Sequence, residues 1–497
     1  MGHKNLSTGM THAQCRLGWI TVTHVCSLWR QVALNHSTLW TCQRFNLGLE
    51  WTAEMLNRAD NAPLNLTLSE EFLLSQPSDD DATTVISKLL HRAGTLTIEE
   101  GAFTTAALKI ITQPAPLMSS LYISSSRGQF VTLPRSLFAD SAPRLRHLFL
   151  CNILPIWTAP ALTGLKGLTI KINRHTDVCD IPSYTDLFNA FRAMPGLESL
   201  ELAGCLPLGA FPHPLKERNV EFPKLRSLTL HGHTTGFCHI VEHLDFPPET
   251  IVGGTCLTDD VTGKECCDIL PLLLSQLPGP SLETLEVSWG NRFDRTFRIK
   301  GYSTSKEENS GKPCFLLRGS RLFSIAFQFK FLLWSPEQKL RILKAVCASL
   351  PTEDLHILSG TLDLGKDAWP EIFGGHQKLR HIRVCSLTTL HSLIPFLAQE
   401  GVYPNLMSLT LSGIDMSSAQ SGTDVLMVVD QLKFSRPPTL SKVFIDSCHI
   451  SRHIIDSMRK AAPDVDIWWD EVELPEQFCT VLGLPHRLHQ SAPLVRK

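Results

Sequence analysis

The chain has 497 residues, and 46 lysine and arginine residues against 48 aspartate and glutamate residues give it a net charge of −2 at pH 7. This balance offers no basic excess for nucleic acid and no acidic tail for a basic partner. The sequence shows no apolar signal run and no uncharged apolar stretch long enough to span a bilayer. We therefore expect a globular protein that is cytoplasmic or nuclear and not secreted, with its 15 cysteines as free thiols.

The first patterned stretch is Gly18–Trp40, GWITVTHVCSLWRQVALNHSTLW, whose apolar residues recur three and four positions apart. This spacing predicts one helix with one apolar face. The face consists of Trp19, Val22, Cys26, Trp29 and Ala33, widened by Val25 and Val32. So short a helix cannot bury that face by itself, so it must pack on the rest of the chain or on a partner.

The same stretch, followed by WTAEMLNRADNAPLNL at Trp51–Leu66, resembles the F-box-like proteins of mushroom-forming (basidiomycete) fungi. Its Val-Cys-x-x-Trp-Arg run and the downstream Leu-Trp pair stand at that family's spacing. The match is to the second half of an F-box, since residues 1–17 contain no Leu-Pro-x-Glu helix. The resemblance implies docking to a Skp-type adaptor of a cullin–RING (SCF-type) ubiquitin ligase. The residues that it implies for adaptor binding are Trp19, Val22, Val25, Cys26, Trp29, Arg30, Leu34 and Trp40.

Strand-like alternation follows at Leu64–Leu68 and Thr95–Ile98, and the chain then repeats a Leu-x-x-Leu-x-Leu unit. Most neighbouring copies are 20 to 34 residues apart, which is the period of leucine-rich repeats. Helix-like runs lie between them, and Ser335-Pro-Glu-Gln338 has the pattern of a capping box. The copies begin at residues 118, 145, 165, 197, 225, 282, 322, 379, 406 and 440.

We therefore predict an α/β fold: an irregular leucine-rich-repeat solenoid, with a curved parallel sheet and outer helices, preceded by a short helical, partial F-box-like segment. The expected boundaries are an unstructured or truncated N-terminus at 1–17, the F-box-like segment at 18–60, the solenoid at 61–470 and a tail at 471–497.

A binding surface is expected along the repeats, because the middle residue of each Leu-x-Leu strand points to the concave, solvent-facing side. Aromatic and arginine side chains in such a row could anchor a protein target, although the row could equally consist of soluble surface positions. The residues chosen for target binding are Tyr122, Phe149, Glu201, Thr229, Glu286, Arg383 and Phe444, and the same row includes Thr169, Ala326 and Thr410.

Two other clusters suggest different chemistry. The histidines and cysteine at His231, His233, Cys238, His239 and His243 could hold a metal, but no acidic residue stands between His239 and His243 as a metalloprotease helix requires. Arg292–Lys300 alternates basic and aromatic residues, which fits an exposed, charge-guarded hairpin edge better than a nucleic-acid site.

Three hypotheses remain open. The leading one is a non-enzymatic substrate-recognition subunit of a cullin–RING ligase, which binds a Skp-type adaptor and a protein target and needs no metal or cofactor. The second is a leucine-rich-repeat scaffold that no longer couples to a ligase. The third is a metal-dependent enzyme built on the histidine cluster. We expect neither nucleic acid nor a membrane as a partner.

Overall fold

The computed structural model forms two compact units, Met1–Thr250 (unit 1) and Ile251–Lys497 (unit 2). The expected N-terminus at 1–17 and residues 472–497 of the expected tail lie outside the described residues. The structure describes residues 18–471 apart from 46, 76–78, 100, 102–104, 126–130, 174–180, 210–218, 260–263, 265–266, 268–270, 272–281, 291–295, 304–320, 330–334, 351, 363–367, 398, 400, 416–438 and 451.

Unit 1 alternates short helices with short strands. Its helices are η1 (Gly18–His24), α2 (Ser27–Asn35), η2 (Ser37–Trp40), α3 (Leu49–Ala59), α4 (Glu70–Ser75), α5 (Asp79–Leu90), α6 (Thr105–Ile111), η3 (Leu137–Asp140), η4 (Pro160–Leu162), α7 (Tyr184–Arg192) and α8 (Thr234–Glu242). Its strands are β1 (Cys42–Gln43), β2 (Leu64–Leu68), β3 (Ala93–Ile98), β4 (Ser120–Ser124), β5 (Val131–Thr132), β6 (His147–Cys151), β7 (Ile153–Leu154), β8 (Gly167–Lys171), β9 (Ser199–Ala203), β10 (Val220–Glu221), β11 (Ser227–His233) and β12 (Leu244–Asp245).

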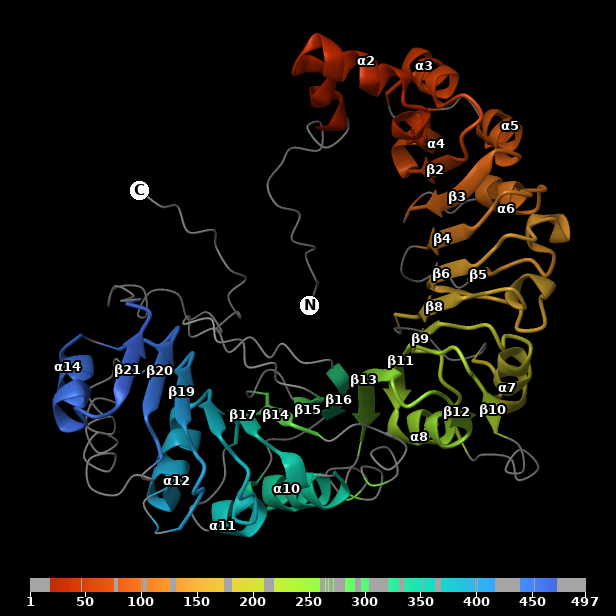
Figure 1. Ribbon diagram of the computed structural model, residues 1–497. Helices are drawn as coiled ribbons and strands as arrows, with labels where there is room; N and C mark the ends of the chain where they lie inside the picture. The colour runs from red at the N-terminus through yellow and green to blue at the C-terminus, as the bar shows by residue number, and fades with distance from the viewer. Residues whose placement is uncertain are drawn as a thin grey trace. The chain divides into compact units, whose positions relative to one another are not determined.

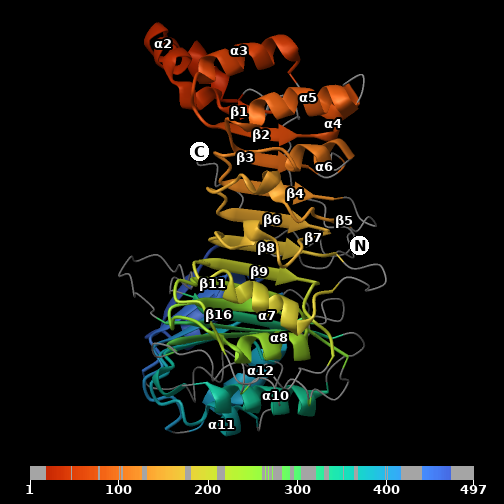
Figure 2. The same ribbon diagram turned by 90° about the vertical axis from the view of Figure 1, so that its right-hand side faces the viewer.

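The main sheet of unit 1 is parallel and runs in chain order. Its strands pair as β1–β2–β3–β4–β6–β8–β9–β11, and Figure 2 shows them stacked in this order. One strand per repeat, each beside the next in sequence, is the arrangement of leucine-rich repeats. The repeat period read from the sequence is therefore confirmed in this unit.

Ladders of leucine explain why these segments become strands. Leu121, Leu148, Leu168, Leu200 and Leu228 are register partners on successive strands, and all are buried. A second buried ladder begins at Ile123, two residues further along. Because strand side chains alternate between faces, both ladders lie on one side of the sheet. Helices α5, α6 and α7 lie along one side of the sheet (Figure 1). An apolar sheet face needs such a layer of helices to bury it.

Unit 2 has helices α10 (Pro336–Ser349), η6 (Thr352–Asp354), α11 (Ala368–Phe373), α12 (Leu387–Leu397) and α14 (Arg452–Ala461). Its strands are β13 (Ile251–Thr258), β14 (Thr284–Trp289), β15 (Thr296–Tyr302), β16 (Arg321–Phe329), β17 (Ile357–Thr361), β18 (His381–Val384), β19 (Ser408–Ser412), β20 (Lys442–Asp446) and β21 (Asp466–Trp469).

The sheet of unit 2 departs from the expected all-parallel order. Its strands pair as β13–β16–β15–β14–β17–β18–β19–β20–β21, so three strands stand in reverse chain order. The strand β15 is antiparallel to both of its neighbours, and the other pairs are parallel. The LFSIAF copy at 322–327 therefore belongs to an antiparallel meander inserted between repeats, and the prediction of a purely parallel sheet is wrong here.

The prediction of an exposed hairpin edge at Arg292–Lys300 is also wrong for Thr296–Lys300, and residues 292–295 lie outside the described residues. The strand β15 forms a hairpin with β14, but its other edge is hydrogen-bonded to β16, so it lies inside the sheet. Phe297 and Ile299 are buried, and Phe297 stacks on Trp289 with ring centres 4.1 Å apart. These apolar residues hold the strand between its neighbours, while Arg298 and Lys300 point to the other face.

The capping box at the start of α10 is confirmed. The Ser335 hydroxyl accepts from the Gln338 amide at 3.2 Å, and the Gln338 side chain accepts from the Ser335 amide at 2.9 Å. We expect Ser335→Ala to speed amide hydrogen exchange in α10 about fivefold, because loss of such a cap costs about 1 kcal/mol. Ser349→Ala, at the far end of the same helix, is the control and should change exchange less than twofold. Equal effects from the two variants would contradict the capping role.

Candidate interaction surfaces

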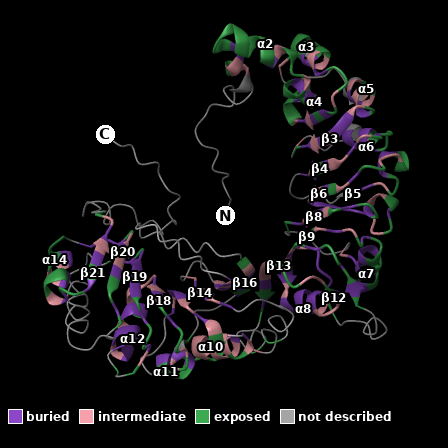
Figure 3. Cartoon of the chain, in the orientation of Figure 1, coloured by how far each residue is buried: buried purple, intermediate pink, exposed green. Residues whose placement is uncertain are grey.

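An apolar face at the start of unit 1 is open to solvent. On α2 the side chains of Leu28, Trp29 and Val32 are 64%, 52% and 56% exposed. Positions 28, 29 and 32 are spaced i, i+1 and i+4, so they share one side of the helix. Figure 3 shows exposed residues along α2. Exposed large apolar side chains gathered on one helix are unusual for a soluble surface, so this face of α2 is a candidate interaction site.

The prediction that Trp19 to Ala33 line one face of a single helix is wrong. The segment Gly18–Trp40 is a 3-10 helix (η1), an extended break at Cys26, the helix α2 and a second 3-10 helix (η2). The β-branched residues Ile20, Thr21, Val22, Thr23 and Val25 lower helix propensity across the break. The predicted face is therefore divided between elements, with Trp19 and Val22 on η1 and Ala33 buried on α2.

The remaining residues chosen for adaptor binding are placed differently. Val25, Cys26 and Arg30 are exposed beside Trp29, whereas Leu34 is half-buried. The exposed apolar residues of this segment that the periodicity missed are Leu28 on α2, Leu39 on η2 and Trp51 on α3. The i, i+4 spacing of Leu28 and Val32 could have identified Leu28 as part of the face. The predicted face was instead assigned through Cys26, Trp29 and Ala33, which left Leu28 out.

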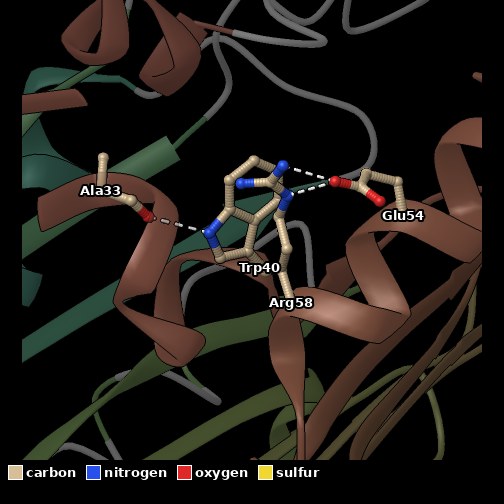
Figure 4. A network of polar contacts seen from close by, with 4 residues as sticks. All are labelled: Ala33, Trp40, Glu54 and Arg58. Carbon is tan, nitrogen blue, oxygen red and sulfur yellow. Dashed lines mark hydrogen bonds and ion pairs between the residues drawn. The ribbon is translucent and has the colours of Figure 1, made fainter. Parts of the chain in front are cut away.

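Trp40 lies in the interior, with 2% of its surface exposed, so it is not part of the exposed apolar face of α2. Its Nε1 donates to the Ala33 carbonyl at 2.9 Å, and the Arg58 guanidinium carbon lies 4.6 Å from its ring centre. Arg58 Nε in turn donates to Glu54 Oε1 at 2.6 Å (Figure 4). These contacts fasten α2 and η2 to α3, so Trp40 organises the segment.

The same segment covers the first edge of the sheet. The strand β1 pairs with β2, and the backbone N–H of Asn65 donates to the Thr41 carbonyl at 2.9 Å. Gln43 is buried, and its side-chain amide donates to the Trp40 carbonyl at 2.7 Å. Because an uncovered edge strand invites pairing with other chains, this two-residue strand is a cap for the repeats.

The predicted row of strand residues is present in unit 1. Tyr122, Phe149, Thr169, Glu201 and Thr229 are register partners across β4, β6, β8, β9 and β11. Each is exposed or half-buried between buried neighbours, so the row faces away from the leucine ladders. We call this side of the unit 1 sheet its open face.

Aromatic rings and one ion pair share the open face. The rings of Tyr122 and Phe149 lie 6.1 Å apart, and Lys171 Nζ is 5.8 Å from the Phe149 ring centre. Lys171 also forms an ion pair with Glu201 at 2.9 Å. The rings can bind an apolar or cationic group, whereas the lysine and the glutamate largely neutralise each other.

A second row lies in unit 2. Glu286, Arg383, Thr410 and Phe444 align in register, with Ser359 between the first two. Glu286 pairs with Lys300 at 2.8 Å. Arg383 on β18 reaches to the end of the neighbouring strand β19, where its Nη2 donates to Ser412 Oγ at 2.7 Å. Thr410 is buried, because the longer Arg383 and Phe444 side chains flank it, whereas Ala326 is half-buried on β16.

The candidate metal ligands do not converge. His239 packs edge-on against Tyr184 with ring centres 5.7 Å apart, and His243 packs against Phe188 at 6.0 Å. The His243 Nδ1 bonds the His239 carbonyl oxygen at 2.8 Å, and burial lowers the pKa of His231. Within the described residues, no three histidine, cysteine, aspartate or glutamate side chains could hold a metal together. His239 and His243 pack against aromatic rings instead.

Comparisons with known proteins add little to this geometry. No protein-family model matches the chain, and no curated protein matches it. A solved leucine-rich-repeat protein from Leptospira interrogans is similar over 83% of this chain and 85% of its own, with 12% identity and a TM-score of 0.29. The fold description therefore depends on the strand pairing itself. In the part of the chain that the structure describes, no helix is both long and apolar enough to cross a membrane.

Proposed function

We propose that this protein is a non-enzymatic interaction subunit that links a Skp-type adaptor of a cullin–RING ubiquitin ligase to a protein target. The exposed apolar face of α2, in a unit whose parallel sheet carries leucine-rich repeats, is the observation that carries the proposal. The adaptor binds Leu28, Trp29 and Val32, and the target binds the open face of unit 1. Such a subunit acts in the cytoplasm or nucleus, and ubiquitin transfer occurs on other subunits.

The energetics of the α2 face favour a partner. Full burial of one large apolar side chain is worth about 1.5–3 kcal/mol, so covering these half-exposed residues gains roughly 3–5 kcal/mol before the costs of association. The face is also prepared for binding, because the buried Ala33 and its hydrogen bond from Trp40 hold the C-terminal part of α2 in place. A partner can therefore bind without first ordering this segment.

A second candidate function is a repeat scaffold without ligase coupling. The pairing of β1 with β2 and the burial of Trp40 favour it, because they give the N-terminal segment a role as a cap that needs no adaptor. In that case the open face binds its partner and the α2 face binds none.

Co-purification of the full chain with a Skp-type adaptor separates these candidates. We expect the native chain to retain the adaptor and Val32→Glu to retain at least tenfold less, because a buried, unpaired carboxylate costs well over 1.4 kcal/mol. Gln31→Glu is the matched control. It adds the same charge at the residue before Val32, which points to another side of α2, and this variant should retain the adaptor. No retention by the native chain, or equal retention by both variants, would favour the scaffold.

A further inference from the structure

We propose that the open face of unit 1 holds an arginine side chain of the protein target. The inference rests on the proposed function only in taking this face as the place where the target binds. The site is a hollow of about 430 Å³ where β3, β4 and β6 lie side by side. Thr97, Ile98, Glu99, Tyr122, Ile123, Ser124 and Phe149 line it.

Tyr122 supplies the platform of the hollow. It is 39% exposed, and its ring is tilted by 36° to that of Phe149. Thr97 is its register partner on β3, and this small side chain leaves space on the β3 side of the ring. A flat group entering from solvent can therefore stack on Tyr122, as a guanidinium group does on aromatic rings.

Glu99 gives the hollow its charge. It follows β3 directly, two positions after Thr97, so its side chain lies on the same face as Tyr122, one strand away. Such diagonal neighbours are about 7–8 Å apart, which lets one guanidinium group cover the ring and reach the carboxylate. Glu99 is exposed and forms no ion pair with any other residue that the structure describes. A partner can therefore supply the missing cation.

The nearby lysine does not repel a positively charged guest. Lys171 lies on β8, two strands from Tyr122, and its charge is balanced by Glu201 at 2.9 Å. It is also directed to the Phe149 ring, 5.8 Å from the ring centre. One end of the row is therefore internally neutral, whereas at the other end no described residue forms an ion pair with Glu99.

Among protein side chains, arginine fits this arrangement best. An aliphatic side chain would cover Glu99 without giving it a partner, and an acidic one would meet a like charge. Lysine supplies a point charge but no flat surface, whereas the guanidinium group both stacks and donates two parallel hydrogen bonds to a carboxylate. Specificity for arginine over neutral analogues of the same shape follows from this pairing.

Retention of the full chain on peptide-coated beads tests the inference. One resin carries Gly-Gly-Arg-Gly-Gly, and the other carries the same peptide with citrulline, which keeps the shape of arginine without its charge. We expect about fivefold more protein on the arginine resin at physiological salt. Glu99→Gln and Tyr122→Ala should each reduce that preference to less than twofold.

Glu221→Gln is the matched control, since it removes an equally exposed carboxylate from β10, outside the hollow, and should leave the fivefold preference intact. Equal retention of the native chain on both resins would overturn the inference. So would equal losses in Glu99→Gln and Glu221→Gln, which would indicate diffuse charge attraction. Adaptor co-purification tests the α2 face, and the peptide resins test the hollow. A negative result in one experiment therefore does not change the result expected in the other.

Discussion

Gly204→Ala is expected to destabilise unit 1 by about 3 kcal/mol or more, measured by amide hydrogen exchange in β8, β9 and β11. Gly204 directly follows β9 and has φ +72°, a conformation that residues with a side chain rarely adopt. A Cβ atom there would stand 2.1 Å from the carbonyl oxygen of Ile172. This oxygen belongs to the backbone, so the clash cannot be relieved by rotating a side chain.

The surrounding hydrogen bonds explain why the backbone cannot move away. The Gly204 amide donates to the His231 carbonyl at 2.9 Å, and the Ile172 amide donates to the Ala203 carbonyl at 2.7 Å. A shift that admits a methyl group must therefore break the register of three neighbouring strands at their ends.

Gly209→Ala is the matched control for this prediction. Gly209 also has positive φ, at +96°, but no atom lies within 4 Å of a Cβ placed there. Only the backbone conformation is then penalised, at a cost of about 1 kcal/mol. Similar losses for both variants would show that backbone conformation, and not the close approach to Ile172, makes Gly204 necessary.

The strands of this protein could be predicted from sequence because each repeat carries its own signal. In LRSLTL, for example, the leucines at 228 and 230 alternate with half-buried residues, and both are buried in β11. The capping box at Ser335 was equally local. Such features depend on a few neighbouring residues, so the sequence contains all that is needed to find them.

The reversed order of β14, β15 and β16 could not be predicted in the same way. Every strand of the inserted meander alternates buried and half-buried residues as the repeat strands do, so the pattern identifies a strand but not its neighbour. The order and direction of strands depend on contacts with residues far away in the sequence. The local pattern of a single strand does not contain this information. The run Arg292–Lys300 was therefore predicted at an edge, whereas the strand formed by its described part, β15, is paired on both sides.

The α2 face was found only in part, for a related reason. Helical spacing located Trp29 and Val32 but also assigned Ala33 to the face, because Ala33 follows Trp29 by four residues; the spacing could not show that Ala33 is buried. Periodicity also cannot show which tryptophan is buried. Trp29 and Trp40 were both predicted to bind the adaptor, yet of these two only Trp40 has its indole nitrogen hydrogen-bonded to a backbone carbonyl.

Truncation of these two tryptophans to alanine is expected to affect different properties: stability for Trp40 and adaptor binding for Trp29. Trp40→Ala should destabilise the N-terminal segment by about 3–5 kcal/mol, since it empties a buried site and removes the contact with Arg58. Amide hydrogen exchange at β1 and β2 measures the loss, because the Asn65 amide stays protected only while Thr41 is held in place. Trp40→Phe keeps the ring and loses the hydrogen bond to Ala33, so it should cost about 1 kcal/mol.

Trp29→Ala is the control from the same segment, and its effect on stability should stay within about 0.5 kcal/mol because the side chain is half exposed. If the α2 face binds an adaptor, the same variant should lose adaptor retention while β1 and β2 remain protected. A large loss of protection in Trp29→Ala would instead mean that this face packs against the chain itself. The pair of variants thus separates the capping role of the segment, which depends on Trp40, from its docking role, which depends on Trp29.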